Sequence, residues 1–167
     1  YTSTDRFPYS QPLTNGTTGI TPGSNYVRNS IKAVIDAYNG TVDLYIVDEA
    51  DPIIRVWQSI FPELFKPESE FPTDLRAHWR YPQDLFVIQA EQYLTYHLTS
   101  ARSVFNRDDV WAVPTEVLRG QTSVPVEPYF VTLRLPDEDE HEFLLIQPFT
   151  LRTRPNAISW LAGRSDG

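Results

Sequence analysis

The stretch that decides the fold is 31–48, IKAVIDAYNGTVDLYIVD, in which two runs rich in β-branched and aromatic residues flank Asn39-Gly40. Alternating apolar and polar residues in such runs are typical of strands. Asn-Gly is the preferred pair for a two-residue type I′ turn. We therefore predict an antiparallel hairpin over about 27–48 that turns at Asn39-Gly40.

This turn fixes the register of the predicted hairpin. The residues that then share one apolar face are paired as Ala37 with Val42, Ile35 with Leu44 and Ala33 with Ile46. The other face places Asp36 opposite Asp43, and like charges across a strand pair are destabilising. Two interpretations follow: a cation or basic partner lies across the sheet, or both carboxylates are solvated on a wet face.

Composition excludes several classes of function. The 167 residues carry 14 Lys plus Arg against 22 Asp plus Glu, a formal charge of −8, so nucleic acid is not an expected partner. The absence of Cys excludes disulfides, thiolate nucleophiles and zinc sites of the cysteine type. No apolar run reaches the roughly 18–20 residues that span a bilayer, so we expect no direct membrane insertion by this segment.

The chain divides by composition into two parts. Residues 1–24 are rich in Thr, Ser, Gly and Pro and predict an extended, partly mobile lead-in. Residues 25–167 predict a single α+β domain. Because the chain starts at Tyr1 and lacks Met, we expect a segment of a longer protein. Because the pattern at 164–167 predicts a turn with nothing after it, we expect the domain to be truncated at its C-terminal edge.

Prolines recur at positions 52, 62, 72 and 82, and proline is accepted in the first turn of a helix. Each predicts a helix start, with short helices from the first three. The helix at about 82–98 is the longest, because no breaker interrupts it. Its apolar face contains Phe86, Ala90, Tyr93, Leu94 and His97.

The last third of the chain predicts a second hairpin at about 127–148, with strands at 129–135 and 142–147. Before it, 100–114 is expected to be irregular, with 106–109 as a cap, and 119–125 to be a flexible loop. A short helix is expected at 156–163, capped by Asn156 and ended by Gly163. The predicted fold class is therefore α+β: an antiparallel sheet built from two hairpins, with several short helices and one longer helix beside it.

No complete catalytic motif occurs, so we predict no catalytic residues and no cofactor. The only metal-ligand candidates are weak ones: Asp36, Asp43, Asp48, Glu49, Asp51 and His97. His97 is interpreted either as a core histidine or as an acid, base or ligand. The acidic run at 137–142 is either a solvated hairpin loop or a weak attractor of cations.

Several strings carry a family resemblance: NSIKAVIDAYNG at 29–40, Asp48-Glu49, Asp51-Pro52, LRAHxRYPxDLF at 75–86, where x is any residue, and AGRSDG at 162–167. They resemble long bacterial membrane proteins grouped as uncharacterised protein family 0182. The resemblance implies a cell-membrane protein several times longer, with multiple transmembrane helices ahead of a large soluble, extracytoplasmic region that includes this segment. It implies no activity. Residues 99–103 depart from the family pattern.

Two functions are open at this point. The first is an interaction or scaffold module of a cell-envelope membrane protein, with the transmembrane portion of its own chain, envelope proteins or peptides as partners. The alternative is a cation-dependent module or hydrolase-like enzyme that uses Asp48, Glu49 and Asp51, with His78 or His97 as proton carrier. An exposed apolar patch favours the first, and convergence of these side chains in one cleft favours the second.

Overall fold

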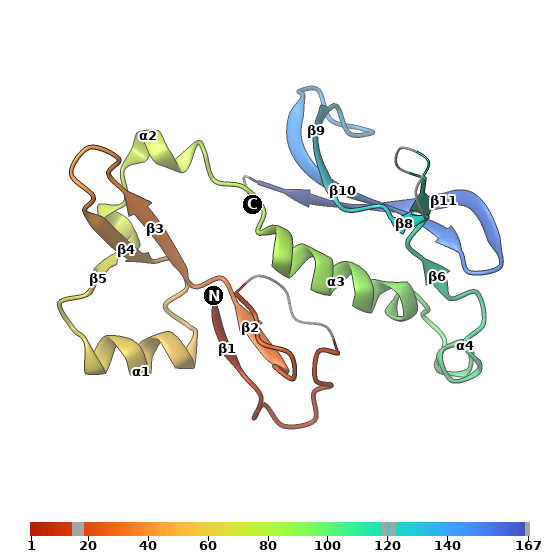
Figure 1. Cartoon of the computed structure of the whole chain (residues 1–167), viewed down its shortest axis with the longest axis horizontal. Helices are drawn as coiled ribbons and strands as arrows, with labels where there is room; N and C mark the ends of the chain where they lie inside the picture. The colour runs from red at the N-terminus through yellow and green to blue at the C-terminus, as the bar shows by residue number, and fades with distance from the viewer. Residues whose placement is uncertain (15–18, 118–119, 121–122, 166–167) are drawn as a thin grey trace. The chain divides into compact units, whose positions relative to one another are not determined.

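The structure, a computed structural model, describes residues 1–14, 19–117, 120 and 123–165. It contains helices and mainly antiparallel sheets and divides into two units, Tyr1–Trp79 and Arg80–Gly167 (Figure 1). The α+β class is confirmed, but the two predicted hairpins belong to separate sheets instead of one. That residues 25–167 form one domain after a partly mobile lead-in stays a prediction.

The first unit is built on the predicted hairpin. Strands β3 (Ile31–Ile35) and β4 (Val42–Ile46) pair antiparallel, and β5 (Phe65–Pro67) joins β4 in parallel. A second small sheet pairs β1 (Thr2–Thr4) with β2 (Tyr26–Arg28). The sequence pattern did not indicate β1, which lies within the expected lead-in.

The predicted register of the hairpin is wrong by two residues. Ile35 pairs with Val42 and Ala33 with Leu44, so the predicted apolar face is kept while each partner changes. The cause is a longer turn: Asp36 Oδ1 accepts the Tyr38 N–H at 2.7 Å, and Gly40, with φ of +74°, donates its N–H to the Asp36 carbonyl at 2.8 Å. Asp36 therefore lies in the turn, and the predicted Asp36–Asp43 pair across the sheet is wrong.

The helices of the first unit are α1 (Pro52–Ile60), the 3-10 helix η1 (Glu68–Glu70) and α2 (Thr73–Arg76). Pro52 occupies the first helical position, as predicted, while Pro72 is the N-cap of α2. The helix predicted from Pro62 is wrong. Residues 62–64 form a turn instead of a helix. The turn leads into β5, whose backbone pairs with β4.

The second unit contains α3 (Gln83–Tyr96), α4 (Ala101–Asn106), β6 (Trp111–Ala112), β7 (Thr115–Glu116), β8 (Val124–Pro125), β9 (Tyr129–Leu133), β10 (Glu142–Leu151) and β11 (Arg154–Arg164). The long helix and the second hairpin, β9–β10, are confirmed. Strand β10 lies between β11 on one side and β9 and β6 on the other, and α3 packs on β10 and β6. Phe86, Leu144, Leu145 and Phe149 are fully buried in this unit's core.

Two predictions in the second unit are wrong. Residues 156–163 belong to strand β11, with neither Asn156 as a helix cap nor Gly163 as a helix end, because the long ladder with β10 outweighs local helix propensity. Residues 100–114 include helix α4, which Ser100 caps and which a left-handed Arg107 ends. The loop expected at 119–125 lies partly outside the described residues; its end, Val124–Pro125, forms β8.

Candidate functional site

Asp51 is the most buried charged side chain of the first unit, with 1% of its surface exposed. Its Oδ2 accepts hydrogen bonds from the hydroxyls of Thr2 and Ser30, the latter at 2.6 Å. Its Oδ1 accepts from the Tyr26 hydroxyl and the Ile53 N–H, each at 3.0 Å. The carboxylate therefore joins β1, β2, the residue before β3 and the start of α1.

The hydrogen bonds decide the charge state of this group. Burial raises the pKa of the Asp51 carboxyl, but the donors Ser30, Thr2, Ile53 N–H and Tyr26 outweigh burial and hold the pKa below its ordinary value. The pKa of the Tyr26 hydroxyl is raised, first by burial and then by its bond to Asp51. An ionised Asp51 with four donors acts as an N-cap and a structural link.

The other acidic candidates of the first unit have partners of their own or are exposed. Asp43 forms an ion pair of 2.8 Å with Lys66. Asp48 accepts the Ala50 N–H at 3.1 Å and lies 3.7 Å from the Arg28 Nη1. Glu49 is exposed. Within the part of the chain that the structure describes, no three His, Asp or Glu side chains are arranged to hold a metal ion.

The sheet face that we expected to be wet is covered in part by aromatic rings. Tyr45, paired with Lys32 across the strands, meets Phe71 edge-on at 4.9 Å, and Phe71 meets Trp79 edge-on at 5.1 Å. The Lys32 ammonium lies 5.3 Å from the Trp79 ring, and burial lowers its pKa. Asp43 therefore lies beside Lys66 on a face that aromatic rings partly cover, and no second carboxylate lies opposite it across the strand pair.

His97 ends helix α3 in the second unit. Its Nδ1 lies 2.9 Å from the Tyr93 carbonyl, and its ring stacks on Trp111 at 3.8 Å. Tyr93 and Trp111 both contact the ring of buried Phe149. His97 is partly buried, and these contacts give it a structural role without deciding between its two interpretations. His78 is exposed in the first unit.

Helix α1 presents an exposed apolar face that the sequence analysis did not single out. Its large side chains, together with two that follow the helix, are all about half exposed: Val56, Trp57, Ile60, Phe61 and Leu64. The rings of Trp57 and Phe61 stack with centroids 6.0 Å apart. The missed signal was the spacing of these residues at i, i+3, i+4 and i+7 after Pro52. Ile54 of the same helix is fully buried.

The second unit has an apolar groove on its main sheet. The groove has a volume of about 640 Å³ and is lined by Tyr129, Leu133, Ile146, Pro148, Ala157, Ile158, Ser159 and Trp160 from β9, β10 and β11. Tyr129, Ile158 and Trp160 keep 49%, 42% and 45% of their surface exposed. A concave surface with exposed aromatic rings suits apolar side chains of a partner.

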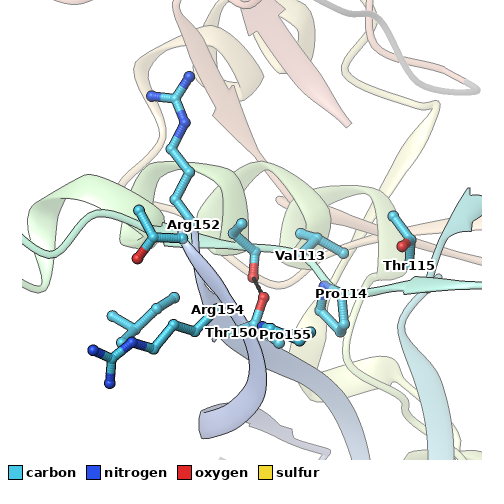
Figure 2. A pocket seen from close by; sticks show the side chains of 10 residues that line it. Val113, Pro114, Thr115, Thr150, Arg152, Arg154 and Pro155 are labelled. Atoms are coloured by element: carbon cyan, nitrogen blue, oxygen red, sulfur yellow. Dashed lines mark hydrogen bonds between the residues drawn. The ribbon is translucent and has the colours of Figure 1, made fainter.

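A smaller cavity of about 360 Å³ lies where β6 meets the turn between β10 and β11 (Figure 2). Thr150 on its wall donates a hydrogen bond to the Ala112 carbonyl at 3.4 Å. The side chains of Arg152 and Arg154 extend in different directions at the rim, so they do not converge on one anion. The cavity therefore lacks the bidentate geometry of a phosphate site.

A family described as Uncharacterised protein family (UPF0182) matches residues 1–167. The chain belongs to this family. A UPF0182 protein of Nostoc is 50% identical over the whole chain, and one of Methanospirillum hungatei is 48% identical over 99% of it.

The UPF0182 relatives are much longer than this chain, which covers 16% of the Nostoc protein and 18% of the Methanospirillum hungatei protein. No solved structure matches it. Among the described residues, no helix is both long enough and apolar enough to cross a membrane. The family description assigns no activity.

Proposed function

We propose that this segment is an interaction or scaffold module in the soluble, extracytoplasmic part of a multi-pass UPF0182 membrane protein. Its partners are the transmembrane portion of its own full-length chain and envelope proteins or peptides. The observation that carries this proposal is the exposed apolar face of α1, formed by Val56, Trp57, Ile60, Phe61 and Leu64.

The energetics of the α1 face support docking. Each of its five side chains keeps between 46% and 57% of its surface exposed. Burying apolar surface contributes roughly 25 cal/mol per Å², and contiguous apolar patches on soluble proteins mark interaction sites. Trp is also among the residues most often found at interface hot spots. A partner that covers Trp57 and Phe61 would therefore gain binding energy from a small area.

Recovery of partners tests this role. Full-length protein carrying Trp57→Ser and Phe61→Ser is compared in a pull-down with the parent and with a variant lacking the segment. Both side chains are about half buried and their rings stack, so the double variant also loses stability, and circular dichroism has to show that it is folded. The folded variant should lose the partners that the deletion also loses.

Tyr38→Ser with Phe105→Ser is the matched control, since both rings are exposed at 103% and 88% and lie outside α1. The control should recover the parental partners. If deletion of the whole segment leaves the recovered partners unchanged, the proposed role is wrong. If the deletion loses partners but the α1 variant recovers them all, the interaction role has to be assigned to another surface of the segment.

A further inference from the structure

Strand β11 is an open sheet edge. Its eleven residues, Arg154–Arg164, pair with β10 on one side, and within the described ranges no strand pairs with the other side. An exposed edge presents unpaired N–H and C=O groups to which a further strand can add. Pro155, near the start of the strand, lacks an N–H, so pairing would use the residues that follow it.

The apolar groove lies beside this edge. Trp160 pairs with Pro148 and Ala162 with Ile146, which places these residues on the groove side of the sheet. Side chains of an added strand alternate between the two faces, so every second one would extend the groove. An occupant with alternating apolar residues would cover Trp160 and also satisfy the backbone of β11.

Charge distinguishes the two ends of β11. Arg164 is held by Glu138 at 3.2 Å and Glu142 at 2.7 Å. Arg152 and Arg154 are exposed at the other end, with no ion pair to a described carboxylate, in a chain of net charge −8. An occupant with an acidic residue at that end is complementary.

A second copy of the chain fits this edge less well. Residues 154–164 contain no Asp or Glu, so β11 of a second copy cannot supply the acidic end that Arg152 and Arg154 favour. The occupant is therefore better sought in a different sequence.

We propose that β11 accepts an extended strand from another part of the same UPF0182 polypeptide. This strand is apolar at alternate positions and acidic at the end beside Arg152 and Arg154. The relatives supply most of their length outside the matched region, and a tethered segment acts at high effective concentration. The inference rests on the proposed role as an interaction module and adds the site and chemistry of one partner.

Site-specific photo-crosslinking in the full-length protein tests it. Benzoylphenylalanine replaces Trp160, and mass spectrometry identifies the captured peptide. We expect a crosslink within the same chain, to a stretch of alternating apolar residues with Asp or Glu at one end. Combining Arg152→Glu with Arg154→Glu should lower the yield about fivefold, which corresponds to loss of ~1 kcal/mol. Arg102→Glu, on exposed α4, is the charge-reversal control and should leave the yield unchanged.

Each remaining outcome overturns the inference. Capture of a different protein at Trp160 excludes an occupant from the same chain, but retains the interaction role. A yield no greater than that of the probe at exposed Tyr38 shows that no strand covers the edge. In that case the pull-down with the α1 variant decides the proposed function separately.

Discussion

The Asp51 carboxylate accepts hydrogen bonds from side chains 21, 25 and 49 residues away in the sequence. In the structure Asp51 is the N-cap of α1, a role that suits an acidic residue directly before Pro52. Its distant donors could not be predicted, because Thr2 and Tyr26 belong to a strand pair whose pattern is too short to read. The same residue was a weak metal candidate, but its four donors give it a structural explanation.

Replacing Asp51 with Ala should lower the free energy of unfolding by about 2–4 kcal/mol. The helix cap contributes roughly 1 kcal/mol, and the buried hydroxyls of Thr2 and Ser30 lose their acceptor at a cost of about 1–3 kcal/mol. Urea unfolding measures the change. Glu49→Ala, two residues away and exposed, is the control and should change stability by less than about 0.5 kcal/mol. Equal effects would show that the Asp51 hydrogen bonds contribute nothing.

The same carboxylate sets a direction of pH dependence. Its folded pKa lies below the ordinary value of 3.8, so the charged form binds its donors in the folded chain. Its contribution to stability is therefore fully present above that value and is lost as the pH falls through the lower folded pKa. The stability difference between the parent and Asp51→Ala should accordingly shrink in acid.

At the scale of elements, the hairpins at 27–48 and 127–148 and the helix at 82–98 could be predicted, because each combines a clear period with a turn or proline signal. Residues 156–163 were predicted as a helix, because Gly163 resembles a helix stop. In the structure Gly163 is in β11, and a Cβ there would lie 2.7 Å from Cγ of Tyr81. Glycine is required here because the Tyr81 ring approaches the backbone closely. Such a contact is visible only once the tertiary packing is known.

Gly163→Ala should therefore destabilise the second unit by about 1–3 kcal/mol, the usual cost of overpacking. The Tyr81 ring is held edge-on by Phe86 at 5.6 Å, and its hydroxyl donates to Gln89 at 2.6 Å, so it has little freedom to withdraw. A double-mutant cycle with Tyr81→Ala checks the cause. Once the ring is removed, Gly163→Ala should cost less than about 0.5 kcal/mol. Additive effects would place the strain elsewhere.

At the scale of the whole molecule, composition indicated the fold class but did not indicate which surfaces are exposed. Apolar content and periodicity predicted a folded α+β chain, since they report how much can be buried. The α1 face and the β11 edge were not predicted, because a periodic apolar residue is assigned to the core unless the packing is known. Trp57 and Trp160 illustrate this: both have core-like chemistry, and both are about half exposed.

The proposed extracytoplasmic position has a direct test, because the segment contains no Cys. Tyr38→Cys places a thiol at the exposed hairpin tip of the first unit. Phe105→Cys places an exposed thiol in the second unit. A membrane-impermeant maleimide should label both variants of the full-length protein in intact cells, above the parent's background. Phe149→Cys, fully buried, should react only after denaturation. Labelling of Tyr38→Cys and Phe105→Cys only after lysis would place the segment on the cytoplasmic side, and its partners would then have to be sought there.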